Sequence, residues 1–257
     1  MKRGYGVSAM INPAHIAPLA KAAEDAGYQT FWVNDVSEAN GLEQLARAQA
    51  TTSTIRLGVG VLPVDRWDAE SIATAVQTNK LDPARLLIGI GAGNLHKGSL
   101  VAVQEVADGL RTLTTSKVLV GALGPKMCAL GGSHANGVLL NWLTPAAITE
   151  LGGLTRTASP LPTEVIAYVR TAVDPAARAR LEAEASSYEG YPSYKRHFDR
   201  MGVRAIDTTI FGDSDAITAR FDAYGPVADE IVARAIAADD SLAAYLDVLH
   251  VASGRGA

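Results

Sequence analysis

The sequence predicts an α/β fold, a compact (β/α)8 barrel of the TIM type with a helical insertion before its last strand. Short β-branched runs alternate with alanine-rich helical stretches along the chain, which is typical of parallel strands joined by crossover helices. The length of 257 residues is close to the ~250 that a closed barrel of this kind uses. The first strand-to-helix turn, Ile11-Asn12-Pro13-Ala14, lacks the G-x-G-x-x-G pattern of an open dinucleotide-binding sheet.

Each predicted strand is a short apolar run between turn signals. Leu86–Ile88 and Val118–Val120 are continuous apolar runs, as expected where both faces of a parallel strand are covered. The predicted strands span Tyr5–Ile11, Thr30–Asn34, Ile55–Leu62, Arg85–Gly91, Lys117–Ala122, Gly137–Trp142, Glu164–Val173 and Val227–Ala235.

Helix-start signals lie between these strands. Asn12-Pro13 opens the first predicted helix with a capping side chain and a first-turn proline, and Gly27 ends that helix. The same chemistry recurs at Asp174-Pro175.

One segment is longer than a crossover requires. Asp174–Tyr224 holds more than one helix and a short strand near Ala205–Phe211, so we expect a helical insertion over residues 174–224 between the seventh and eighth strands. No linker or low-complexity stretch divides the chain. We therefore expect a single domain over residues 1–257, with a frayed tail at residues 253–257.

Composition excludes several classes of protein. With 23 basic and 27 acidic side chains, the chain lacks the basic surface of a nucleic-acid-binding protein. No apolar run reaches the ~18 residues of a membrane helix, and no secretory signal follows Lys2 and Arg3. Because Cys128 is the single cysteine and the histidines show no metal-binding spacing, we expect a cytoplasmic protein without a disulfide or metal site.

Two predicted strands carry alternating glycines, Gly58 and Gly60 in one and Gly89, Gly91 and Gly93 in the other. Residues two apart share a face of a strand, so each row leaves that face without side chains. If the rows face the barrel interior near its mouth, they make room for a flat ring. The alternative is close packing without a ligand.

A second candidate feature is the turn that follows the strand at Lys117–Ala122. Gly124 precedes a helix that begins with Pro125, which leaves N–H groups and the positive end of the helix dipole free for an anion such as phosphate. Lys126 adds a positive charge. The alternative is an ordinary strand-to-helix turn with a surface lysine.

Polar residues end two other strands, where barrel enzymes keep functional groups. Asn141 can fix a polar ring edge and Trp142 can form a pocket wall, or the pair is a turn and a core indole. Asp35, after Asn34, is a candidate general acid or base or a contact to a cofactor hydroxyl. Its alternative roles are to cap a helix or to pair with a nearby base.

Several of these runs together resemble the luciferase-like monooxygenase family. Their order and spacing match from about residue 5 to residue 250, and the Gly-Pro-Lys stretch is similar to the deazaflavin-dependent, actinobacterial branch. The runs that carry the resemblance are Ala22–Tyr28, Phe31–Asp35, Ile55–Val61, Leu87–Gly93, Gly121–Met127 and Asn136–Trp142.

The resemblance implies a barrel that binds FMN or the deazaflavin coenzyme (F-420) at its C-terminal mouth, with a non-prolyl cis peptide at Gly60–Val61 behind the ring. It also implies a homodimer. The cofactor contacts that it implies are Ala92, Gly93, Asn94, Gly121, Ala122, Gly124, Asn141 and Trp142. The candidate cofactor-binding set is completed by Asn34, Asp35, Gly60, Val61, Pro125 and Lys126.

Two departures from the family pattern concern catalysis. Sugar-phosphate dehydrogenases of the family have an Asp-His pair where this chain has Asp35-Val36, so their imidazole acid/base is missing. The chain is also short, and residues 94–116 leave room for one helix only. Asp35 is the one catalytic candidate that the sequence offers.

The leading hypothesis is a deazaflavin-dependent oxidoreductase that transfers a hydride to or from a small organic substrate. One alternative is an FMN-dependent monooxygenase that activates oxygen. Another, of a different class, is a non-catalytic flavin- or deazaflavin-binding barrel that has lost its substrate loops.

Overall fold

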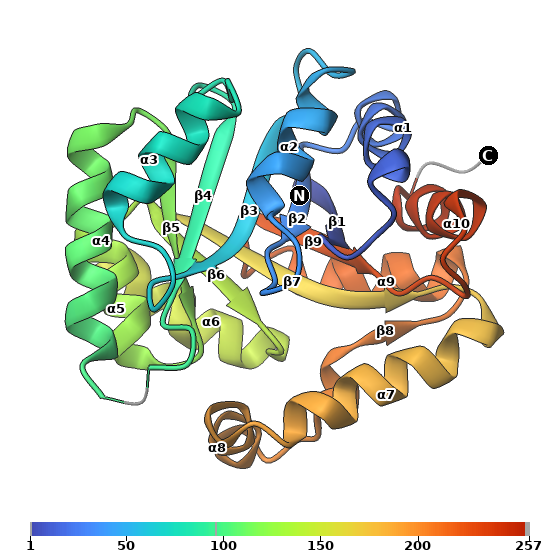
Figure 1. Cartoon of the computed structure of the whole chain (residues 1–257). Coiled ribbons are helices and arrows are strands. Elements are labelled where there is room, and N and C mark those ends of the chain that lie inside the picture. The colour runs from blue at the N-terminus through green and yellow to red at the C-terminus, as the bar shows by residue number, and fades with distance from the viewer. Residues whose placement is uncertain (1, 96, 255–257) are drawn as a thin grey trace.

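The chain forms a closed barrel of parallel strands, as predicted (Figure 1). The computed structural model describes residues 2–95 and 97–254. Within them, the β1–β9 and β6–β7 pairings close a ring of eight strands, and every pairing is parallel. The ring consists of β1 (Lys2–Ser8), β2 (Thr30–Asn34), β3 (Arg56–Pro63), β4 (Leu86–Gly91), β5 (Lys117–Ala122), β6 (Gly137–Asn141), β7 (Glu164–Ala172) and β9 (Glu230–Ala235).

Crossover helices cover the outside of this ring. Figure 1 shows α3, α4 and α5 on one side of the barrel and α1 and α10 on another. The helices outside the insertion are α1 (Pro13–Asp25), α2 (Gly41–Gln49), α3 (Ala69–Thr78), α4 (Ser99–Leu113), α5 (Pro125–His134), α6 (Pro145–Thr157) and α10 (Leu242–Ala252).

The predicted helical insertion lies between β7 and β9. Its α9 (Ser214–Tyr224) is the crossover helix of the last unit, whereas α7 (Arg178–Glu189) and α8 (Pro192–Met201) are additional. Figure 1 shows α7 and α8 together, with β8 (Ile210–Phe211) beside α7. The strand expected near residues 205–211 is therefore a 3-10 turn over Ala205–Thr208 followed by the two-residue β8, which pairs with the end of β7 outside the ring.

The first strand has different bounds from those predicted. The sequence pattern places it at Tyr5–Ile11, but β1 runs over Lys2–Ser8. The N–H of Ile11 donates to the carbonyl of Ser8 at 3.2 Å, so the chain already turns towards α1 at this point.

Three strands, β3, β4 and β7, differ from the prediction by one residue at one or both ends. Two other bounds differ for a reason that the structure shows. Trp142 lies outside β6 because its φ of 56° ends the extended conformation. The last strand begins at Glu230 rather than Val227, because the N–H of Val227 still donates to the carbonyl of Tyr224 at 3.1 Å, at the end of α9.

A buried apolar layer fills the interior of the barrel. Its largest member, Trp32, lies where Gly58 has no side chain: a Cβ built at Gly58 would come within 2.2 Å of the Trp32 ring. Glycine is thus required at position 58 because the Trp32 ring packs against the backbone there. Close packing without a ligand is the alternative role that the sequence left open for the glycine row of this strand. The layer consists of Trp32, Leu87, Leu119, Leu139, Ile166, Tyr168 and Val232, with Val61 packed against it.

Below this layer, a charged network closes the N-terminal end of the barrel. The buried Glu230 accepts hydrogen bonds from Trp32 Nε1 at 2.9 Å and from Arg56 at 2.6 Å. Arg56 also pairs with Glu164 at 2.9 Å, and Lys117 donates to Glu164. Burial acts to raise the pKa of Glu164, but Lys117 and Arg56 outweigh it and hold that pKa below its usual range.

The last helix ends at Ala252, and residues 255–257 of the predicted frayed tail lie outside the described residues. In the part of the chain that the structure describes, no helix combines the length and the apolar character that crossing a bilayer demands.

We expect Glu230→Gln to lower the free energy of unfolding by about 3 kcal/mol, because it removes one partner of a buried ion pair. Unfolding in urea, followed by circular dichroism, measures the change. The control is Glu182→Gln, which breaks an exposed pair with Arg178 on α7 and is expected to have little effect. Equal effects of the two substitutions would contradict the structural role of Glu230.

Candidate cofactor site

Asn34 joins three strands at the C-terminal mouth. Its Nδ2 donates to the carbonyl of Gly60 at 2.8 Å, and its Oδ1 accepts from Nε of Arg234 at 2.9 Å. The side chain of this residue at the end of β2 thereby connects β3 with β9. Asn34 holds the backbone of Gly60 in place.

The peptide bond between Gly60 and Val61 is cis, as the family resemblance implies. The Val61 side chain lies where Gly91 and Gly121 have none: Cβ atoms built there would come within 2.8 and 2.7 Å of its methyl groups. Val61 is half-buried and packs against the interior layer. The glycines of β3 and β4 therefore face the barrel interior, and Val61 fills part of the space that they leave below the mouth. The last glycine of the predicted second row lies beyond the end of β4.

The loop after β4 is held to the loop after β3. The N–H of Asn94 donates to Asp65 Oδ2 at 3.0 Å. Gly93 has a φ of 58°, and a Cβ there would lie 2.0 Å from Asp65 Oδ1, so only glycine fits. Asn94 and Gly93 are exposed, and Ala92 is half-buried.

The N-terminus of α5 has no capping side chain. Gly124 occupies the cap position, Pro125 begins the helix, and both Pro125 and Lys126 are exposed. Arg200 of α8 lies beside this turn and donates to the carbonyl of Leu123 at 2.5 Å. The turn thus offers unpaired backbone N–H groups, a helix dipole and positive side chains, a combination suited to a phosphate. Gly121 and Ala122, which precede it, end β5.

Asp35 is engaged on both carboxylate oxygens. Oδ1 accepts from the N–H of Gly41 at 2.9 Å, at the start of α2, and Oδ2 pairs with Arg66 at 3.1 Å. Its side chain is only 2% exposed. Burial raises the pKa of Asp35 above its usual value, while Gly41 and Arg66 act in the opposite direction. Asp35 therefore makes the contacts of both of its alternative roles. One oxygen accepts a hydrogen bond at the start of a helix, and the other pairs with a base.

Asn141 and Trp142 contact the insertion. Asn141 accepts a hydrogen bond from Arg170. The buried Trp142 ring lies 4.1 Å from the Arg170 guanidinium and 4.8 Å from the ring of Tyr188 on α7. Its Nε1 has no hydrogen-bond partner among the described residues. These contacts make Trp142 part of the core beneath α7 and α8.

The sequence interpretation did not single out Arg170, Glu184, Arg234 or a role for His197. Arg170 and Arg234 each follow an apolar run near the end of a strand that begins with a glutamate, and a charge at that place was the available signal. Glu184 and His197 lie on surface-patterned helices, where nothing in the sequence marks them.

His197 ties α8 to the mouth. Its Nδ1 lies 2.9 Å from the carbonyl oxygen of Leu123, and its Nε2 lies 2.8 Å from that of Trp142. Burial lowers the pKa of His197. The helix therefore bridges the loop after β5 and the loop after β6.

Cys128 is buried in α5, and burial raises its pKa to about 12, so the thiol is not activated. Among residues 2–95 and 97–254, no group of three or more His, Cys, Asp or Glu side chains is placed to hold a metal ion.

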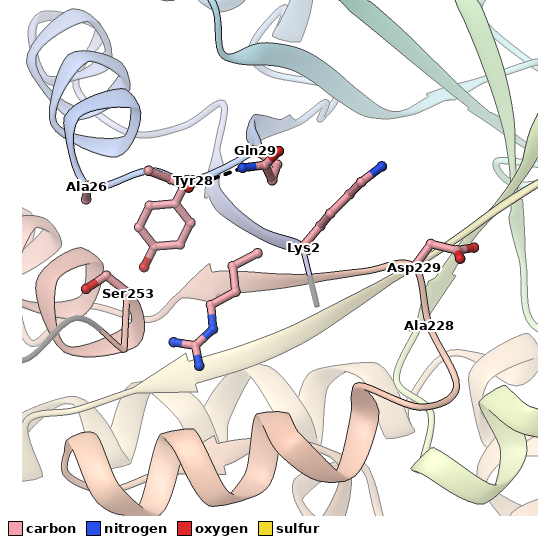
Figure 2. Close-up of a pocket in the computed structure, with 9 residues that line it drawn as sticks. Lys2, Ala26, Tyr28, Gln29, Ala228, Asp229 and Ser253 are labelled. Atoms are coloured by element: carbon pink, nitrogen blue, oxygen red, sulfur yellow. Dashed lines mark hydrogen bonds between the residues drawn. The ribbon is translucent and has the colours of Figure 1, made fainter.

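A cavity of about 640 Å³ lies at the opposite end of the barrel (Figure 2). Lys2, Tyr28 and Gln29 are among the residues that line it (Figure 2). Arg3 also lines it, donates to the carbonyl of Ala252 at 2.9 Å and stands 5.4 Å over the ring of Phe221. This cavity is a gap between the start of β1 and α10, remote from the predicted site at the strand ends.

Comparison with known proteins finds similarity in sequence and in fold. The family model for luciferase-like monooxygenases matches residues 2–97. The family resemblance is confirmed. A 5,10-methylenetetrahydromethanopterin reductase of Archaeoglobus fulgidus is 28% identical, with 47% of this chain and 47% of the relative aligned. The reductase of the same name from Methanolobus tindarius is 25% identical, over 66% of this chain and 65% of the relative. The chain thus aligns with about half to two thirds of these relatives.

Solved structures show the same fold over the whole chain. An F420-dependent secondary alcohol dehydrogenase, in complex with an F420-acetone adduct, superposes with a TM-score of 0.75 at 15% identity and covers 98% of both chains. The coenzyme F420-dependent tetrahydromethanopterin reductase of Methanopyrus kandleri gives 0.71 at 18% identity, with 98% and 97% covered. A diketocamphane monooxygenase of Pseudomonas putida, in complex with FMN, gives 0.69 at 14% identity, with 98% and 97% covered.

The buried Asp35 and Asp68, which caps α3, are expected to make the free energy of unfolding depend on pH in opposite directions. The pKa of Asp35 is raised, so the folded chain binds its proton more readily than the unfolded chain, and stability falls as the pH rises through that pKa. The pKa of Asp68, lowered by hydrogen bonds from Ser71 at the start of α3, has the opposite effect: stability rises as the pH rises towards the usual aspartate value.

Asp35 makes the urea midpoint fall as the pH rises, and Asp35→Asn is expected to remove that fall. Asp68 makes the midpoint rise with pH, and Asp68→Asn is expected to remove that rise. Urea midpoints between pH 3 and pH 7 measure both. If both variants changed the pH profile in the same direction, the placement of Asp35 in a desolvated position would be wrong.

Proposed function

We propose that this protein is an oxidoreductase that binds a deazaflavin coenzyme at the C-terminal mouth and transfers a hydride between it and a small organic substrate. The observation that carries this proposal is the uncapped turn at Gly124-Pro125-Lys126, which stands at the same mouth as the Gly60–Val61 cis peptide. The match to the luciferase-like family and the F420-dependent solved neighbours support it.

The residues of the mouth fit such a coenzyme. Val61 and Gly60 would lie behind the ring, with Asn34 fixing the Gly60 carbonyl. The exposed Gly93-Asn94 backbone would border it, and the N–H groups at the start of α5, with Lys126, would bind the phosphate. The coenzyme, when bound, supplies the hydride chemistry, while the protein binds, orients and excludes water.

The remaining candidate contacts have positioning roles in this proposal. Asp35 has both oxygens occupied, so we assign it to holding the start of α2 and Arg66 rather than to proton transfer. Asn141 is held by Arg170, and Trp142 supports α7 and α8. Gly121 and Ala122 end β5 and lead into the turn at Gly124-Pro125-Lys126.

Titration of the purified apoprotein with the deazaflavin coenzyme and with FMN tests the cofactor. We expect the deazaflavin to bind at least about tenfold more tightly, which corresponds to 1.4 kcal/mol. Fluorescence of the ligand and isothermal titration calorimetry both measure the affinities. Tight binding of FMN alone, together with oxygen-dependent turnover, would favour the FMN monooxygenase, and binding without any redox turnover would favour the non-catalytic barrel.

Lys126→Ala is expected to weaken deazaflavin binding about tenfold, because one charge beside the phosphate is lost. Lys21→Ala is the control: Lys21 is an exposed lysine on α1 that pairs with Asp25. The affinities are measured by the same titration at two salt concentrations. An unchanged affinity for Lys126→Ala would place the phosphate elsewhere.

We also propose the homodimer that the family resemblance implies. Sedimentation velocity at several protein concentrations measures the oligomeric state directly. A monomer at all concentrations would contradict this part of the proposal.

A further inference from the structure

Two arginines lie side by side at the mouth. Arg170 of β7 and Arg234 of β9 are directly paired in the parallel register of these two strands. Their side chains are 3% and 12% exposed. Like charges placed opposite each other on neighbouring strands destabilise a sheet, and burial increases the effect. Such a pair therefore needs negative charge nearby.

One carboxylate serves both arginines. Glu184 of α7 accepts from Arg170 Nε at 2.9 Å and lies 3.7 Å from Arg234. Among the described residues, no other carboxylate lies within ion-pair distance of either guanidinium. Their remaining hydrogen-bond partners are the neutral side chains of Asn34 and Asn141 and the carbonyl of Ala235. The cluster therefore has two positive charges and one negative charge.

The carboxylate comes from the inserted helix and is the most accessible member of the cluster. The Glu184 side chain is 24% exposed, in contrast to the two arginines. Burial acts to raise the pKa of Glu184, but Arg234 and Arg170 outweigh it and hold that pKa below the usual value. An ionised carboxylate is thus the group that this position stabilises.

Two polar groups without partners border the arginines. Trp142 Nε1 is buried without a hydrogen-bond acceptor, on a ring that lies 4.1 Å from the Arg170 guanidinium. The hydroxyl of Tyr168 is also buried and unpartnered, two residues before Arg170 and on the same face of β7. Both can donate, and donors beside surplus positive charge are suited to an anion.

We propose that Arg170 and Arg234 form the binding site for a carboxylate group of the small-molecule substrate, and that Glu184 occupies this place when no substrate is bound. A carboxylate is preferred because the cluster already holds one, in contact with both arginines. The assignment to a substrate rests on the proposed function. The binding of a carboxylate to the two arginines does not depend on the proposed function.

Glu184→Gln tests the exchange, because glutamine keeps the size of the side chain and an oxygen for Arg170 while it removes the competing charge. Acetate is the probe, with acetamide and chloride at matched concentration as controls. We expect calorimetric titration of the apoprotein to give at least about tenfold tighter acetate binding for Glu184→Gln than for the unsubstituted chain. Glu182→Gln, on the exposed side of the same helix, should leave acetate binding unchanged.

Substitution of an arginine completes the test. Adding Arg170→Gln to Glu184→Gln should abolish acetate binding, and Arg170→Lys, which keeps the charge, should restore part of it. Circular dichroism of each variant shows that the loss is not a failure to fold. Equal acetate binding by Glu184→Gln and the unsubstituted chain, or no preference for acetate over chloride, would overturn the proposal.

The same titration separates substrate from coenzyme. With the deazaflavin at saturation, acetate should still bind to Glu184→Gln. If the coenzyme displaced acetate, the arginines would hold a group of the coenzyme and the substrate assignment would be wrong. If no flavin or deazaflavin bound at all, the proposed function would fail, whereas the acetate measurements on the apoprotein would still decide whether the carboxylate site exists.

Discussion

The packing of Trp32 inside the barrel is the constraint on which the rest of the structure depends. Its ring fills the interior because Gly58 on the neighbouring strand has no side chain, and its Nε1 donates to the buried Glu230 below. The apolar layer and the charged network beneath it therefore seal the barrel from the N-terminal end. The proposed site lies at the opposite, C-terminal mouth, where barrels of this kind place their functional groups.

Above this layer, polar contacts connect strands that are far apart in the sequence. Asn34 links the Gly60 carbonyl to Arg234, and Arg234 lies near Glu184 on α7. Consecutive contacts thus connect the inserted helix with the backbone of Gly60. His197 provides a second connection, from α8 to the turn before Gly124.

The additional helices of the insertion lie beside the mouth. The sequence leaves room for one helix only over residues 94–116, and the structure has α4 there. Here α7 and α8 instead cover the side of the mouth formed by β6 and β7, where Trp142 and Tyr188 pack together. Specificity for a substrate would then depend on side chains of the insertion, which agrees with the position of Glu184.

The sequence by itself determined the barrel, because strand and helix periodicities are local and each unit carries its own apolar pattern and caps. β2 and β5 have the predicted bounds, and the alternation marks the glycines of β3 and β4, but only the tertiary structure shows that these glycines face the interior. The roles of single residues needed the tertiary structure. Asp35 reads as a catalytic candidate until Gly41 and Arg66 are seen to occupy both its oxygens. The pairing of Arg170 with Arg234 depends on the β7–β9 register and on a glutamate from an inserted helix. Such contacts join residues distant in the chain, and no local pattern encodes which of them will meet.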